Sequence, residues 1–139
     1  YLVRCCGHPL NEQFRCEDPI ARGRGQAGSR EIDQQGHRAV TEFQVLRRIS
    51  DGSSLLEARP LTGRTNQIRI HLWGLGMPVL GDPAYLEGHQ KAASQTLRID
   101  QPPMCLHASK LSVNHPQSSD PIELVAPRPG WIDQIDPVI

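Results

Sequence analysis

The stretch "EARPLTGRTNQIRIHLWGLG", residues 57–76, decides the fold because its pattern changes partway along. Its first residues complete a strand, which a tight turn at Thr62-Gly63 ends. Beyond this turn, apolar side chains recur at i, i+4 and i+7, the period of an amphipathic helix. These side chains are Ile68, Leu72 and Leu75. Because glycines at positions 74 and 76 stop a helix, the stretch predicts a strand, a tight turn and a short helix.

The same stretch places basic side chains among apolar ones. Arg64 lies in the turn and Arg69 in the first turns of the predicted helix, whose N-terminal N–H groups and dipole already attract anions. Arg69 adjoins the apolar stripe, so we expect it to be partly buried and to need a carboxylate partner. On these residues alone two interpretations stay open: a site for phosphate or carboxylate, and a structural salt bridge between helix and sheet.

Short strand patterns occupy much of the remaining chain. The segments at 39–49 and 55–61 flank an Asp51-Gly52 turn and predict a β-hairpin. Further strand-like segments are "YLVRCC" (1–6), "MPVL" (77–80), "MCLHASKLSVNHP" (104–116) and "PIELVAP" (121–127). The predicted fold class is therefore α+β, a mixed, mainly antiparallel β-sheet with a few short helices.

A chain of 139 residues is long enough for one domain with a real core. Three polar segments are expected outside the sheet. They are a flexible loop at 22–38, a surface excursion at 88–103 and a tail at 132–139. A strand that begins at residue 1 predicts that its neighbours lie upstream and are missing. On this interpretation residues 1–6 form an unpaired edge through which the chain would associate with itself.

Composition narrows the classes of function. With 15 basic and 15 acidic residues the formal net charge is zero, which argues against polyanion binding driven by bulk charge but allows a local basic patch. No apolar run is long enough to span a bilayer, so no membrane partner is expected. The four cysteines, without a CxxC pair, are expected to be reduced thiols of a cytosolic, or cytoplasmic, protein and not metal ligands.

One glycine motif is rejected as a nucleotide site. Gly23-x-Gly25-x-x-Gly28 has the spacing of a dinucleotide-binding fingerprint. That fingerprint requires an apolar strand before it and an apolar helix after it, and the flanking sequence has neither.

The order of segments along the chain resembles one family. "RPLTGRTNQIRIHLWGLGMPVLGDPAY" (59–85) closely resembles the arginine-rich motif of the RluA-type pseudouridine synthases, Pro-x-Thr-Gly-Arg-x-His-Gln-Ile-Arg-x-His-Leu followed by Gly-x-Pro-Ile-x-Gly-Asp and a Tyr. Further segments that are similar to family elements are "YLVRCCGHP", "EDPIA", "GHRAVTEFQVLRR", "LHASKLSVNHP" and "IELVAPRP". The resemblance runs from residue 1 to about residue 130, and it implies part of the pseudouridine synthase catalytic fold.

The resemblance implies a specific chemistry. Members of this family isomerise uridine in RNA, ribosomal or transfer, to pseudouridine without cofactor or metal, after the base is flipped into a pocket. Their nucleophile is an Asp in a His-Arg-Leu-Asp-x-x-Thr-Ser-Gly segment that lies upstream, and this chain has no such segment. Asp82 matches the Gly-Asp of the family motif and is interpreted as a turn residue.

Roles transfer residue by residue. The resemblance makes Tyr1 the tyrosine that packs on the flipped uracil, and Arg69 the arginine that pairs with the nucleophilic Asp and keeps it ionised and aimed. Arg64, Asn66 and Gln67 are candidates for RNA binding. Asn66 stands where the family has His, so it can orient a group by hydrogen bonding but cannot carry a proton.

Structural alternatives remain beside these roles. Arg64 could make a structural contact, Gln67 could brace the turn, and His71 is interpreted as a hydrogen-bonded core histidine.

Three interpretations of the whole chain follow. The first is the C-terminal portion of an RNA pseudouridine synthase, inactive alone because its partner, the N-terminal half of the same domain, is missing. The second is a degenerate RNA-binding module without catalysis. The third is a structural scaffold. Only the first predicts an Arg-Leu-Asp segment upstream of Tyr1.

Overall fold

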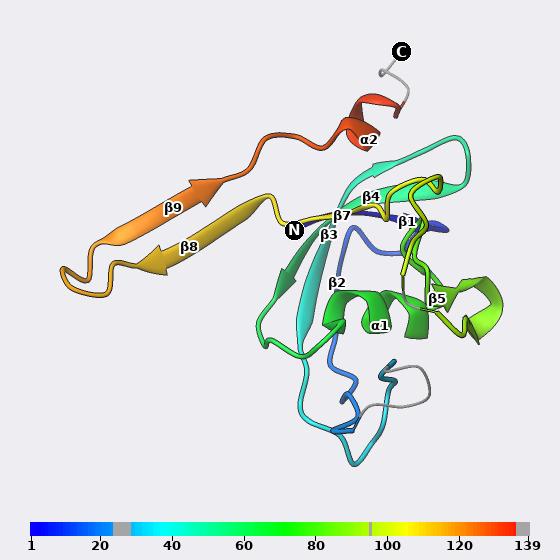
Figure 1. Cartoon of the computed structure of the whole chain (residues 1–139), viewed down its shortest axis with the longest axis horizontal. Helices are drawn as coiled ribbons and strands as arrows, with labels where there is room; N and C mark the ends of the chain where they lie inside the picture. The colour runs from blue at the N-terminus through cyan, green and yellow to red at the C-terminus, as the bar shows by residue number, and fades with distance from the viewer. Residues whose placement is uncertain (24–28, 95, 136–139) are drawn as a thin grey trace.

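The computed structural model describes residues 1–23, 29–94 and 96–135. Its centre is a five-stranded antiparallel sheet in the order β2-β3-β4-β1-β7 (Figure 1). The strands are β1 (Leu2–Cys6), β2 (Gln13–Cys16), β3 (Thr41–Arg48), β4 (Ser53–Pro60) and β7 (Leu106–His107). With two short helices, α1 (Gln67–Gly74) and α2 (Gly130–Asp133), this arrangement confirms the predicted fold class.

The β3–β4 hairpin forms as its sequence predicts. Alternate side chains of β3 point into the core, where Phe43 lies opposite Ala58 and Val45 opposite Leu56. The connecting turn contains Gly52 at a φ of 87°, a conformation that glycine adopts without strain. The period-2 pattern and the Asp-Gly turn therefore fix both the hairpin and the face it buries.

The prediction that β1 exposes an unpaired edge is wrong. β1 pairs with β4 along its whole length on one side, and with β7 at Leu2 and Val3 on the other. Beyond β7, the N–H of Cys6 donates to the carbonyl of Pro78, and the carbonyl of Arg4 accepts from Leu80. The neighbours of β1 are thus downstream strands, because an alternating pattern shows that a segment is a strand but not which distant segment pairs with it.

Helix α1 lies against one face of the sheet and divides the core in two (Figure 1). Ile68 and Leu72 pack with the sheet residues, while Ile70 faces a second cluster that contains Tyr85. The helix begins at Gln67, because Asn66 just before it adopts a left-handed conformation with a φ of 58°.

The polar segment around residue 30 contacts the end of this helix. A Cβ at Gly74 would lie 2.3 Å from Cδ1 of Ile32, so the glycine admits this close approach. The helix is closed by Gly76, which adopts a left-handed φ of 75°. Ile32 and His37 form isolated bridges with Ile20. Within the loop predicted at 22–38, Ser29 is buried and Ile32 packs on the helix, while most other side chains of 30–38 are exposed. The glycine motif at 23–28 lies almost wholly outside the described residues.

A second hairpin projects from the body of the molecule. Strands β8 (Lys110–Asn114) and β9 (Pro121–Val125) extend away from the sheet, as Figure 1 shows. Their register places four apolar side chains on one exposed or partly exposed face of the ribbon: Leu111, Val113, Ile122 and Leu124. After β9 the chain returns, and Trp131 and Ile132 of α2 pack with Leu2 and Leu80.

The excursion predicted at 88–103 is short and exposed. Its first residues complete a short hairpin, in which strand β5 (Tyr85–Leu86) and the 3₁₀ helix η2 (Glu87–His89) lead into strand β6 (Gln90–Lys91). The longest helix in the described ranges has eight residues, and none there is long and apolar enough to cross a membrane.

Candidate functional site

All five residues predicted for the site line one cavity of about 310 Å³. This cavity is termed the Arg69 cavity. Its walls come from the residue before β1, the turn at 62–66, the first turn of α1 and the strand β7. The predicted residues among its lining are Tyr1, Arg64, Asn66, Gln67 and Arg69. Apolar side chains, including Ile68 and Leu106, complete it, so the cavity offers both a surface for a planar ring and polar groups to orient it.

Arg69 is buried and rigidly held at the base of helix α1. Its Nε donates to Oδ2 of Asp82 at 2.7 Å, and its Nη2 donates to Oδ1 of Asp82 at 2.6 Å. Its Nη1 donates to Oδ1 of Asn66 at 3.0 Å. These bonds use three of the five N–H donors of a guanidinium group, so two have no partner among the described residues.

Asp82 was interpreted from the sequence as a turn residue, and the structure gives it a second role. Its Oδ1 accepts the N–H groups of Ala84 and Tyr85, which is the expected turn. The same carboxylate forms a bidentate ion pair with Arg69. Among the described residues, the acidic partner of Arg69 is therefore Asp82. The sequence signal was the segment "GDPAY", where an acidic residue follows the helix closely enough to fold back on it.

The ring of Tyr85 supports the guanidinium group from one side. Cζ of Arg69 lies 5.0 Å from the ring centroid, a cation–π distance. The phenol of Tyr85 donates to the carbonyl of Arg30 at 2.9 Å and accepts from its N–H at 3.1 Å. Tyr85 was not among the predicted site residues, and it ties the segment around residue 30 to the site.

Gln67 braces the turn that forms one wall of the cavity. Its Oε1 accepts from the hydroxyl of Thr62 at 2.7 Å and from the N–H of Arg64 at 3.0 Å. Its Nε2 donates to the carbonyl of Val40 and to the hydroxyl of Thr41. These contacts agree with the structural interpretation of Gln67 as a brace for the turn. Its role in RNA binding stays a prediction.

Arg64 lies at the rim of the cavity and is exposed. Its Nε donates to the carbonyl of Arg38 at 3.1 Å, which orients the side chain without neutralising its charge. Tyr1, 40% exposed, pairs with Ala58 through two backbone hydrogen bonds and so extends β1 by one residue. The cationic rim and the tyrosine thus face the same cavity from different walls.

His71 is a hydrogen-bonded core histidine, as predicted. Its side chain is fully buried, with Nδ1 2.9 Å from the hydroxyl of Thr41 and Nε2 2.9 Å from the carbonyl of Asp18. Burial lowers the pKa of His71 below its usual value, although the Asp18 contact opposes this change. A neutral imidazole in this position serves packing, not proton transfer in the cavity.

The cysteines show the chemistry of unreactive thiols. All four are free, and three of them are buried. Burial raises the pKa of Cys5 to about 12 and that of Cys16 to about 11. Among residues 1–23, 29–94 and 96–135, no group of three or more His, Cys, Asp or Glu side chains could hold a metal ion.

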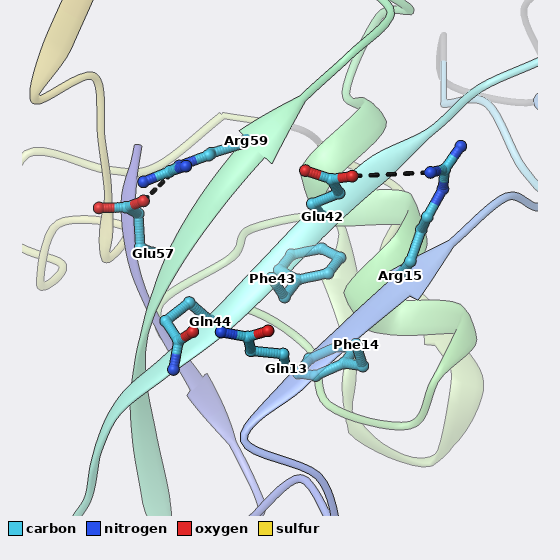
Figure 2. Close-up of a pocket in the computed structure, with 8 residues that line it drawn as sticks. All are labelled: Gln13, Phe14, Arg15, Glu42, Phe43, Gln44, Glu57 and Arg59. Carbon is cyan, nitrogen blue, oxygen red and sulfur yellow. Dashed lines mark hydrogen bonds and ion pairs between the residues drawn. The ribbon is translucent and has the colours of Figure 1, made fainter.

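A larger hollow, of about 490 Å³, lies on the outer side of β2, β3 and β4 (Figure 2). Figure 2 shows Arg15 directed at Glu42 and Arg59 at Glu57. Each arginine therefore already has a carboxylate partner on an exposed surface. Because this hollow contains none of the predicted site residues and presents paired charges, the Arg69 cavity is the stronger candidate.

Comparisons with known proteins agree on one family. A model of the family described as RNA pseudouridylate synthase matches residues 1–73. The dual-specificity RNA pseudouridine synthase RluA of Haemophilus influenzae is 42% identical over 81 residues, which are 58% of this chain and 34% of that protein. The RluA protein of Yersinia pestis is 32% identical over 123 residues, covering 88% of this chain and 56% of that protein.

A solved structure agrees as well. Human RNA pseudouridylate synthase domain containing 1 superposes with a TM-score of 0.71 at 31% identity, over 92% of this chain and 53% of that one. The chain spans about half the length, or less, of the curated relatives it matches.

Proposed function

Because the chain belongs to the RNA pseudouridylate synthase family, we propose that it forms part of an enzyme that converts uridine in RNA to pseudouridine. The reaction breaks the bond between C1′ of the ribose and N1 of uracil, and it forms a bond between C1′ and C5. The proton at C5 leaves and N1 gains one, so the reaction is an isomerisation that needs no co-substrate. What the protein must supply is a nucleophile, a pocket for the flipped base, and fixed charges that hold both.

The Arg69 cavity supplies the pocket and one fixed charge. Tyr1 offers an aromatic surface on which the uracil can stack. Arg69 retains two N–H donors at a buried position, which suits a carboxylate better than it suits water. In this proposal Arg69 is shared: Asp82 holds one edge of its guanidinium group, and the catalytic carboxylate approaches the remaining donors and stays ionised because of them.

The catalytic carboxylate comes from a segment outside these 139 residues. Asp82 cannot be that nucleophile, since its oxygens are occupied by Arg69 and by two backbone N–H groups. The half-length match to relatives and the uncovered apolar face of the β8–β9 hairpin both favour a missing complementary half of the domain. The isolated chain is therefore expected to be inactive.

Arg64 and Asn66 lie on the rim side of the cavity, where the RNA backbone would enter, and the buried Gln67 holds the turn that carries them. Arg64 is the member with an exposed, uncompensated charge, so it is the expected phosphate contact. The RNA is ribosomal or transfer RNA, recognised by its shape. The proposal implies a cytoplasmic protein, with which the four free cysteines are consistent.

The observation that carries the proposal is the meeting of Tyr1 and Arg69 in one cavity. Its test uses a matched pair of substitutions, Arg69→Lys and Arg59→Lys, in the complete protein that contains this chain. Lysine keeps the charge but loses the planar fork. We expect Arg69→Lys to lower turnover by roughly 100-fold, because the catalytic carboxylate loses its alignment. Arg59, whose side chain is 71% exposed, should tolerate the change.

Turnover is measured as tritium released from RNA that carries uridine labelled at C5, since the isomerisation removes that hydrogen. Near-normal turnover of Arg69→Lys would remove Arg69 from the site. RNA binding without any tritium release from the complete wild-type protein would instead favour the degenerate RNA-binding module.

A further inference from the structure

Asp82 is the most deeply buried partner of any ion pair in the described part of the chain. Its side chain is 1% exposed, and that of Arg69 is 11% exposed. Burying two charges costs desolvation energy that their attraction often fails to repay, so a buried pair is weak evidence of a device for stability. Here Arg69, one member of the pair, lines the cavity, and Asp82 holds it from behind, which indicates a role in the site.

The surroundings of Asp82 leave its carboxylate one orientation. Oδ1 is fixed by the N–H groups of Ala84 at 2.8 Å and Tyr85 at 3.0 Å, so the side chain cannot rotate without breaking the turn. The fixed carboxylate then grips Nε and Nη2 of Arg69 together. Asn66 holds Nη1, and the Tyr85 ring covers one side. The plane of the guanidinium group is therefore set by contacts that all belong to this chain.

We propose that Asp82 is a positioning residue for the isomerisation, acting through Arg69. It holds the guanidinium group by one edge so that the two remaining N–H donors keep a fixed direction for the catalytic carboxylate. This inference rests on the proposed function, but the fixing of Arg69 by Asp82 can be tested without catalysis. It predicts that loss of the Asp82 charge impairs the chemical step more than it impairs RNA binding.

The substitution Asp82→Asn isolates the ion pair from the turn. An asparagine Oδ1 can still accept from Ala84 and Tyr85, while its Nδ2 would present a donor to the Nε–H of Arg69. Asp51→Asn is the matched control. Like Asp82, Asp51 accepts with Oδ1 the backbone N–H of the residue two positions later, here Ser53, and its Oδ2 pairs with an arginine, Arg4. Asp51 differs in lying in the β3–β4 turn, away from Arg69.

The first measurement is hydrogen exchange at the Arg69 Nε–H, followed by NMR in the 139-residue chain. We expect Asp82→Asn to speed this exchange by roughly tenfold, because a charge-assisted bond is lost, and Asp51→Asn to leave it unchanged. Unchanged exchange in Asp82→Asn would overturn the inference.

The second measurement is the split between kcat and KM in the complete protein. We expect Asp82→Asn to lower kcat by roughly 100-fold with little change in KM, and to add little further loss in an Arg69→Lys background. Equal losses in both backgrounds would show that Asp82 acts independently of Arg69 and would overturn the inference. If the wild-type protein is inactive but Asp82→Asn releases Arg69 in the exchange experiment, the proposed function fails while the fixing of Arg69 by Asp82 stands.

Discussion

Two arginine–aspartate pairs in this molecule are built alike and lie in opposite settings. In each, one carboxylate oxygen caps a turn by accepting a backbone N–H, and the other accepts from an arginine. Asp51 lies in the β3–β4 turn with its side chain 51% exposed, whereas Asp82 is 1% exposed beneath helix α1. The difference teaches that local turn chemistry is shared, while tertiary packing decides whether the charge becomes part of a site.

The largest expected effect on stability comes from removing the arginine of the buried pair. Arg69→Ala leaves the Asp82 carboxylate buried without its counter-ion, which should destabilise the chain by about 3–5 kcal/mol. Arg4→Ala leaves Asp51 in contact with water, and the loss should stay at about 1 kcal/mol or less. Urea denaturation of both variants measures the free energy of unfolding. Equal losses would mean that Asp82 is relieved by water or by movement of its turn.

The same comparison explains what the sequence could and could not reveal. The hairpin and helix α1 were predictable because their periodicity and turn residues act locally. The partners of β1 were not predictable, because β4 and β7 lie about 50 and 100 residues downstream and an alternating pattern does not identify the strand with which a segment pairs. Packing between distant segments, not propensity, placed β1 inside the sheet.

The site shows the same division. Four of its five predicted residues fall within 64–69, and the fifth, Tyr1, lies at the chain start in a recognisable motif. Their convergence on one cavity therefore followed from local order together with the family resemblance. Asp82 looked like Asp51, an acidic residue in a glycine turn, because nothing in either segment states how deeply it will be buried. Tyr85 was missed for the same reason.

His71, in helix α1, should make the stability of the protein depend on pH. Burial lowers the pKa of His71 in the folded state below its unfolded value. Between the two values the unfolded chain binds more protons, so stability is full above pH about 6.5 and declines as pH falls through that value towards the folded pKa. We expect wild-type urea midpoints to drop between pH 7 and pH 5.

A single substitution tests this prediction. His71→Gln should reduce the slope of unfolding free energy against pH, whatever its effect on absolute stability. A slope that persists in His71→Gln would assign the pH dependence to another group.

The smallest effect concerns Asp51 itself. Hydrogen bonds from the Ser53 hydroxyl and N–H, with a further contribution from Arg4, lower the pKa of Asp51 below its usual 3.8. The stabilisation is therefore present above pH about 4 and is lost as pH falls through the folded-state pKa. Because the carboxylate is half exposed, salt should screen the Arg4 contribution.

Wild type and Asp51→Asn should consequently differ in urea midpoint at pH 5, with the difference shrinking at pH 3 and in high salt. Subtracting the two proteins at each pH removes the His71 contribution, which both share. A difference that stays constant with pH would place the role of Asp51 in the shape of the turn and not in its charge. The exposed pair would then lack even the weak electrostatic coupling that its geometry implies, and the contrast with the buried Arg69–Asp82 pair would widen.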